Sequence, residues 1–202
     1  MLLDALTKHI APFLSGLWNS VVLWRSLALA AWGLLSVAWW QREHLRQWLM
    51  RLSQMEHDKR LFLGVDEIAD ESALMGIVDS LLDTASLSRT GMQVLARLNE
   101  YLGLESNQHL SRPLRDAAVD LRIALSAALD FTACNFFDHG EAADGSDCFC
   151  LHPEFNVDQK WPVDPMDMTR FDHYVKQLDK RAVALGDRYR HYRRAVKRKL
   201  HV

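Results

Sequence analysis

The sequence predicts an all-α protein with one strongly apolar helix near its N-terminus. Apolar residues recur at helical spacing along most of the 202 residues, helix-capping residues precede the periodic stretches, and no stretch clearly indicates a strand. We expect an amphipathic segment at 1–19, a transmembrane helix at 20–41, a juxtamembrane helix at 42–64 and a cytoplasmic helical domain at 65–202.

The transmembrane helix is predicted from Val21–Trp40, which carries a single charge, Arg25. Twenty helical residues reach about 30 Å, the thickness of the hydrocarbon core of a bilayer. Indole rings stand near both ends, and the Arg25 side chain is long enough to reach the headgroups. The predicted membrane-interface residues are Trp18, Trp24, Arg25, Trp39 and Trp40.

Two alternatives compete with a spanning helix. The uncharged run, Ser26–Trp40, is only fifteen residues long, so a buried helix or one covered by a partner is also compatible with it. A cleaved signal peptide fits less well, because a basic n-region is almost absent. Cations are more frequent after the run than before it, which predicts a single-pass protein of the inner or plasma membrane with its C-terminal domain in the cytoplasm.

The segments flanking the apolar run are amphipathic. At 1–19 the apolar residues share one face and Pro12 is expected to kink the helix, which we expect to lie along the membrane surface, line a pore or pack on a neighbouring subunit. At 42–64 a stripe of leucines and Trp48 alternates with arginines, and the helix is expected to end near Gly64. Further helices are expected after Asp66, Thr90 and Ser111.

The last third of the chain is predicted to contain an irregular acidic loop, 138–168, followed by a basic helix, 169–200. The helix carries a heptad-like stripe, which is expected to form either a seam between subunits or a face within its own bundle. The stripe comprises Phe171, Val175, Leu178, Ala182, Leu185, Tyr189, Tyr192 and Val196.

Arginines and lysines are concentrated near the C-terminal end of this helix, interleaved with aromatic residues. Such a pattern suits RNA, an acidic protein partner, pairing with acidic segments of the same chain, or anionic lipid. The candidate contacts are Arg188, Arg190, Arg193, Arg194, Lys197, Arg198 and Lys199.

Cysteines and histidines cluster around the predicted loop. Four thiol or imidazole groups suffice for a tetrahedral zinc site, so zinc is a candidate cofactor. The Cys-x-Cys-x-His spacing, however, is not the Cys-x-x-Cys spacing that strongly indicates zinc. Buried apolar cysteines beside surface histidines are the alternative. The residues are Cys134, His139, Cys148, Cys150 and His152.

Two Arg-x(4–6)-His pairs, Arg51 with His57 and Arg194 with His201, are similar to the motif of HEPN-type ribonucleases. That resemblance implies an all-α enzyme whose arginine and histidine act on the scissile phosphate of RNA. Membrane-anchored HEPN-like accessory proteins of bacterial antiviral immunity have a similar outline. With 17 arginines and 9 histidines in 202 residues, about two such pairs are expected by chance.

The predicted function is therefore that of a membrane-anchored helical protein that forms homo-oligomers, as a membrane-perturbing or pore-forming effector or as a scaffold. A tethered HEPN-like ribonuclease or RNA-binding accessory is one alternative. A soluble partner-binding subunit whose apolar helix is covered in a complex is another. Phosphate-binding loops and common hydrolase motifs are absent, so no small-molecule substrate is indicated and an enzyme is the less favoured class.

Overall fold

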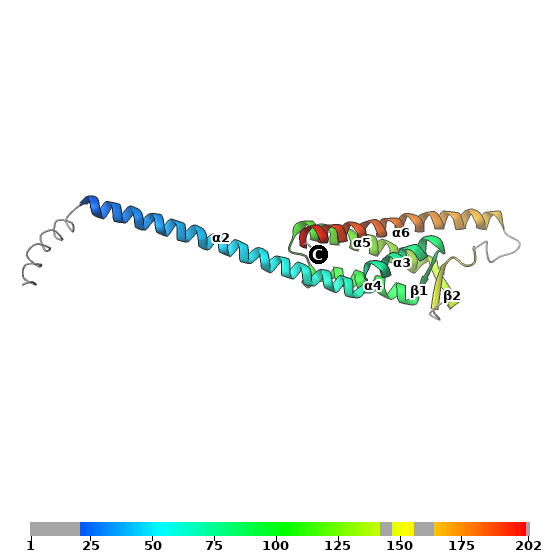
Figure 1. The fold of residues 1–202 in the computed structure, drawn as a ribbon. Helices are drawn as coiled ribbons and strands as arrows, with labels where there is room; N and C mark the ends of the chain where they lie inside the picture. Colours follow the sequence, from blue (N-terminus) through cyan, green and yellow to red (C-terminus); the bar gives the residue numbers. More distant parts are fainter. Residues whose placement is uncertain (1–20, 142–146, 156–163, 201–202) are drawn as a thin grey trace, which may run out of the picture. The chain divides into compact units, whose positions relative to one another are not determined.

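The computed structural model describes residues 21–141, 147–155 and 164–200, with side chains omitted at 21–23 and 139–141. The described chain is mostly helical, which confirms the all-α prediction (Figure 1). It divides into two compact units, Met1–Leu52 and Ser53–Val202. The predicted amphipathic segment 1–19, Trp18 and His201 lie outside the described residues.

Helix α2 (Val21–Ile68) is a single helix of 48 residues, so the two helices predicted over 20–64 are continuous. Gly64 does not end it, since the helix runs on to Ile68. A Cβ at position 64 would collide with the Tyr101 phenol ring. The glycine therefore permits the close approach of Tyr101, whose hydroxyl donates to the Leu61 carbonyl at 3.4 Å.

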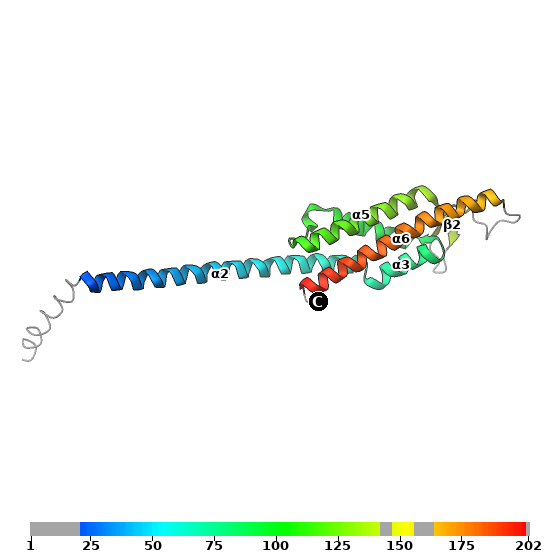
Figure 2. The same cartoon turned by 90° about the horizontal axis from the view of Figure 1, so that it is seen from above.

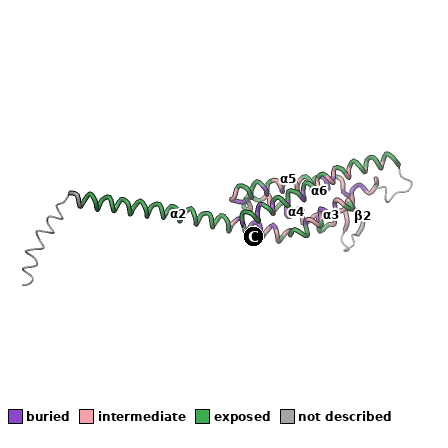
Figure 3. The backbone as a smooth tube through the Cα atoms, turned by 45° about the horizontal axis from the view of Figure 1, so that its top comes forward, coloured by how far each residue is buried: buried purple, intermediate pink, exposed green. Residues whose placement is uncertain are grey.

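In the first unit, every described side chain of α2, from Trp24 to Leu52, is exposed (Figure 3). No helix among the described residues is long and apolar enough to cross a membrane. The transmembrane helix predicted at 20–41 is therefore not supported. Two features make the described part of this helix less apolar than the predicted span. The side chains of Val21–Leu23 are not described, and the remaining ones include Arg25 and several indole rings, which are less apolar than aliphatic side chains.

The second unit is a helical bundle built from the end of α2 and four further α-helices. These are α3 (Glu71–Asp83), α4 (Arg89–Gly103), α5 (Arg112–Asn135) and α6 (Pro165–Leu200), with a short 3₁₀ turn, η1, at Glu105–Asn107. Asp70, not the predicted Asp66, caps α3 by accepting from Ala73 N at 2.7 Å. Ser88 caps α4 by accepting from Gly91 N at 3.0 Å.

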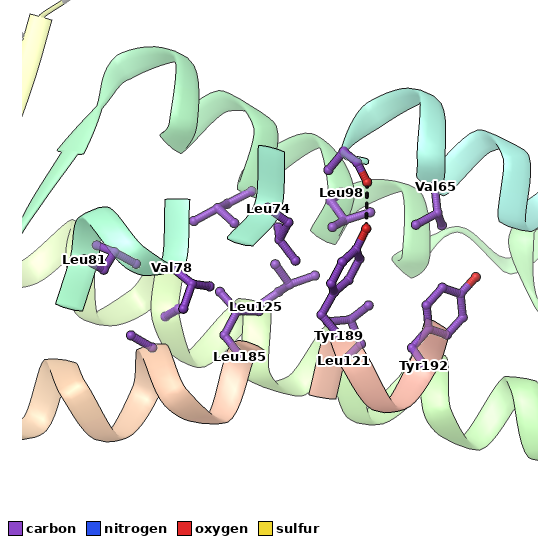
Figure 4. Packing of buried hydrophobic residues seen from close by; sticks show 14 of the residues in the cluster. Val65, Leu74, Val78, Leu81, Leu98, Leu121, Leu125, Leu185, Tyr189 and Tyr192 are labelled. Carbon is purple, nitrogen blue, oxygen red and sulfur yellow. Dashed lines mark hydrogen bonds between the residues drawn. The ribbon is translucent and has the colours of Figure 1, made fainter. Parts of the chain in front are cut away.

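Helices α5 and α6 run side by side in Figures 1 and 2, and α3 and α4 complete the core. Figure 4 shows Tyr189 of α6 among leucines of α3, α4 and α5, and Tyr192 of α6 on the side of Val65 of α2. Six residues of the heptad-like stripe are buried here, while Phe171 and Val175 are half-buried. The stripe is therefore a face within the bundle, and α6 already has its partners in the same chain.

A small antiparallel sheet replaces part of the irregular loop predicted at 138–168, and helix α6 begins within that range, at Pro165. Its strands are β1 (Ser86–Ser88), β2 (Phe136–Glu141) and β3 (Asp147–Leu151), in the order β1-β3-β2. The register pairs Leu87 with Phe149 and Phe136 with Leu151. Strands this short carry too few alternating residues to stand out in the sequence, and β1 pairs with a strand about sixty residues away. The rest of the predicted loop, 142–146 and 156–163, lies outside the described residues.

Candidate functional site

The most unusual surface is the apolar arm, which we define as residues 24–40 of α2. Its large apolar side chains are exposed on every side of the helix, with Leu29 and Trp32 each 74% exposed. The Ser36 hydroxyl donates to the Trp32 carbonyl at 2.8 Å, so its polar group is satisfied within the helix. A helix that is apolar all round normally lies inside a protein core or in lipid. The exposed members are Trp24, Leu27, Leu29, Trp32, Leu34, Leu35, Val37, Trp39 and Trp40.

Of the predicted membrane-interface residues, Trp24, Trp39 and Trp40 are exposed at the two ends of the arm, together with Arg25. Trp40 stacks on His44 with ring centroids 5.3 Å apart. After the arm, residues 42–52 mix exposed leucines with Arg42, Glu43 and Arg46. The composition of α2 thus changes near residue 41 from mainly apolar, with Arg25 as the one charge, to amphipathic.

A buried polar cluster in the second unit joins α2, α5 and α6. Asp58 of α2 is 1% exposed, and its carboxylate accepts from the backbone N–H groups of Leu110 at 2.8 Å and Ser111 at 3.1 Å. Ser111, the N-cap residue of α5, makes no side-chain capping bond. Asp58 therefore provides, from another helix, a carboxylate acceptor at the N-terminus of α5.

His109 completes the cluster between Asp58 and Tyr192. Its Nδ1 lies 3.3 Å from Asp58 Oδ1, and its Nε2 lies 3.0 Å from the Tyr192 hydroxyl. Burial lowers the pKa of His109, although the Asp58 carboxylate acts in the opposite direction. A neutral imidazole fits both contacts, donating from Nδ1 to Asp58 and accepting at Nε2 from Tyr192. Since all three side chains are buried, the cluster holds the helices together and is closed to a substrate.

Arg193 is the one member of the predicted basic contact set that points into the bundle. Its Nη1 donates to Asp66 and, at 3.0 Å, to the Tyr189 hydroxyl. Its Nε lies 3.1 Å from Glu71 Oε2, an ion pair whose geometry does not make a hydrogen bond. The guanidinium also lies 5.3 Å from the Phe62 ring centroid. Arg193 therefore joins α6 to α2 and α3 and is not available for a ligand.

The other members of that set lie on the surface of α6. Arg188 pairs with Asp120 at 3.0 Å, and Arg190 pairs with Asp187 at 3.1 Å. The remaining four form no ion pair within the described residues and are exposed: Arg194, Lys197, Arg198 and Lys199. Binding of RNA, an acidic partner or lipid by these cations remains a prediction.

The predicted zinc ligands that the structure describes, Cys134, Cys148, Cys150 and His152, do not form one site. Cys148 and Cys150 are neighbours on β3, with sulfur atoms 3.9 Å apart, but His152 is held by Glu154 at 2.8 Å and by Asn135 at 3.1 Å. Cys134 is exposed on α5, and the His139 side chain is not described. Among described residues, no group of three or more potential ligands is close enough to hold a metal ion.

The two Arg-x(4–6)-His pairs have different surroundings. His57 is half-buried with its Nε2 3.2 Å from the Gln108 carbonyl, whereas Arg51 belongs to the first unit. Arg194 is exposed, and its Nε donates to the Arg190 carbonyl at 3.3 Å. His201 is not described, so the ribonuclease alternative stays a prediction.

Comparison of the chain with protein-family models, curated proteins and solved structures gives no match. Functional inference therefore depends on the surfaces and clusters of the chain itself. Asp58 and His109 were not predicted as important residues. In the sequence they are polar residues next to apolar ones. Most polar residues in such a setting are exposed to solvent, so the sequence does not indicate that these two are buried.

Proposed function

We propose that this protein is a membrane-anchored helical protein that assembles with further copies of itself. The observation that supports the proposal is the exposure of apolar side chains around the whole circumference of the arm. Each large apolar side chain left in water forgoes about 1.5–3 kcal/mol of burial free energy. A surface with this many exposed leucines and tryptophans is therefore expected to be covered in the functional protein.

Lipid accounts for the pattern better than a protein partner alone. A coiled-coil partner covers one stripe of a helix and leaves the opposite face in water, whereas lipid surrounds it. Small residues in the arm, among them Ala28, Ala31 and Gly33, let neighbouring arms approach closely within the bilayer. A Cβ on Gly33 would meet nothing within 4 Å, so the glycine has no packing role among the described residues of the single chain.

The finer form of the proposal is a single span over 20–41 with the bundle in the cytoplasm, acting as a membrane-perturbing or pore-forming effector or as a scaffold. Such a span includes residues 20–23, whose side chains precede the described part of the arm. The cations that follow the arm, Arg42, Arg46 and Arg51, suit the cytoplasmic surface.

Membrane fractionation tests the anchoring. The full chain is expressed in bacteria, and membranes are washed with alkaline carbonate. Replacing Leu34 and Leu35 by glutamate is expected to shift the protein from the washed pellet to the supernatant, because one charge near the centre of an inserted helix costs about 2.5–3.5 kcal/mol. Replacing Leu104 and Val183, exposed apolar residues of the bundle, by glutamate is the matched control. Wild-type protein that remains in the supernatant would overturn the proposal.

Assembly is tested separately in mild detergent. Light scattering coupled to size exclusion is expected to give a protein mass several times that of one 23.2 kDa chain. A clean monomer at micromolar concentration would remove self-assembly and leave only the anchor.

A further inference from the structure

Beyond the apolar arm, a stripe of exposed apolar side chains runs along α2. Leu45, Trp48, Leu52 and Met55 follow one another at steps of three and four residues, and each is 36–59% exposed. Gln41 occupies the preceding position of the same pattern. Alternating steps of three and four residues give the 3.5-residue repeat of a coiled coil, in which successive apolar residues stay on the side that faces a partner helix.

The stripe borders a hollow of about 400 Å³ on the surface of α2. Four of the residues that line it stand at positions i, i+3, i+4 and i+7: Gln41, His44, Leu45 and Trp48. In a coiled coil, four residues of one helix form the hole that receives an apolar side chain of the facing helix. The surface of α2 is therefore shaped for a second helix whose apolar side chains have the same repeat.

Two opposite charges, Arg51 and Glu56, flank the stripe on its two sides. They are five residues apart, which separates them by about 140° around the helix axis, so they are too far apart to pair within one helix. Both are exposed, and neither forms an ion pair in the part of the chain that the structure describes. In a parallel coiled coil, side chains at these two flanking positions pair between the helices.

We propose that residues 41–55 of α2 form a parallel, in-register coiled coil with the same residues of a second copy of the chain. Each stripe residue then lies beside its own counterpart, and no stripe residue is charged. Arg51 lies beside Glu56 of the partner subunit, and Glu56 lies beside Arg51 of the partner subunit. The twofold axis runs along the two helices, so both arms extend in the same direction, as anchoring in one membrane requires.

Charge and spacing select a second copy over other occupants of the stripe. Hydrocarbon would leave Arg51 and Glu56 unpaired at the edges of the apolar surface, at a cost in free energy. A nucleic acid would be attracted by the arginine but repelled by the glutamate. A second copy supplies the opposite charge at each flank together with the matching 3.5-residue repeat.

This inference rests on the proposed self-assembly and identifies one of its interfaces. The next position of the repeat is the exposed Lys59, where two like charges would meet, so the seam ends at Met55. From Gln41 to Met55 it is about 21 Å long. Such an interface lies below roughly 1,200 Å² of total buried area and binds weakly in dilute solution. Arms held in the same membrane raise the effective concentration of the helices, which populates a weak contact.

Cysteine crosslinking in isolated bacterial membranes tests the seam. In a full chain whose exposed Cys134 is replaced by serine, Leu52→Cys is expected to form a disulfide-linked dimer on mild oxidation. Met50→Cys is the matched control, because Met50 is 56% exposed but lies on the opposite side of the helix from the seam. Its dimer yield is expected to be at least fivefold lower. Equal yields at the two positions, or no dimer at position 52, would overturn the proposal.

A second cysteine position tests the parallel direction. Leu45→Cys is expected to crosslink as strongly as Leu52→Cys, because every seam position of a parallel pair lies beside its own counterpart. An antiparallel pair cannot bring two positions seven residues apart each beside its own counterpart. A strong crosslink at only one of the two positions would therefore overturn the parallel register.

Charge reversal tests the flanking pairs. In the Leu45→Cys background, Arg51→Glu and Glu56→Arg are each expected to lower the dimer yield about fivefold, because two attractive pairs become repulsive. When the two variants are coexpressed with tags of different length, the mixed dimer is expected to recover the yield, since each copy then supplies only one sign. Reversals without effect, or no recovery in the mixed dimer, would overturn the pairing of Arg51 with Glu56 of the partner subunit.

These experiments separate failure of the seam from failure of the membrane anchor. A chain carrying Leu34→Glu and Leu35→Glu that no longer pellets with membranes, yet keeps the selective crosslink at position 52, would leave this inference standing. A chain that pellets and gives a multiple mass in detergent, but has no selective crosslink, would leave the proposed function standing and remove the seam.

Discussion

Replacing Asp58 by alanine is expected to destabilise the bundle strongly, because this buried carboxylate links α2 to the start of α5. It accepts from two backbone N–H groups there and from His109, and it is 1% exposed. Alanine leaves the buried His109 and the two part-buried N–H groups without this acceptor, at up to about 1–3 kcal/mol each, partly offset by the removal of a buried charge. We expect the free energy of unfolding to fall by about 3–5 kcal/mol, a large share of the 5–15 kcal/mol typical of a domain.

The measurement is urea unfolding of the full chain in mild detergent, followed by circular dichroism at 222 nm. Tryptophan fluorescence is unsuitable, because the described tryptophans belong to the exposed part of α2. The matched control is Asp116→Ala, which removes an exposed carboxylate 3.7 Å from Arg112 and is expected to cost less than about 0.5 kcal/mol. If Asp58→Ala loses no more stability than this control, the buried cluster does not hold the helices as argued.

Three further changes have defined outcomes. Burial lowers the pKa of His109, so below about pH 6.5 the unfolded chain binds a proton that the folded chain does not. The contribution of His109 to stability is therefore complete above that pH and falls as the pH drops toward the lowered pKa. Thermal melting over a pH series should show a shallower fall for His109→Gln than for the wild-type chain. Arg193→Met removes the ion pairs with the partly exposed Asp66 and Glu71 and the bond to the Tyr189 hydroxyl, and should cost about 1–2 kcal/mol in urea unfolding. Arg190→Met, at an exposed pair, should cost under about 0.5 kcal/mol. Burial and the neighbouring Cys148 raise the pKa of the Cys150 thiol to about 11, so iodoacetamide at pH 8 should label it at least tenfold more slowly than the exposed Cys134, as read by peptide mass spectrometry; equal rates would contradict the burial.

Helix positions were predictable from sequence where the apolar spacing was long and regular. The stripe from Leu178 to Val196 correctly indicated a helix, because four turns or more of periodic leucine, alanine and tyrosine have no comparable strand alternative. The three strands were missed because each is six residues or shorter and β1 pairs with β3 from far along the chain. Local sequence contains no record of that pairing, so Cys148 and Cys150 were placed in an irregular loop.

Polar residues were harder to assign, because their roles depend on which helices meet. Arg193 and Arg194 are neighbours in a basic run and look equivalent in the sequence, yet Arg193 lies against Phe62 while Arg194 is exposed. One helical step, 100°, separates the two directions, and the sequence does not say which cation faces α2.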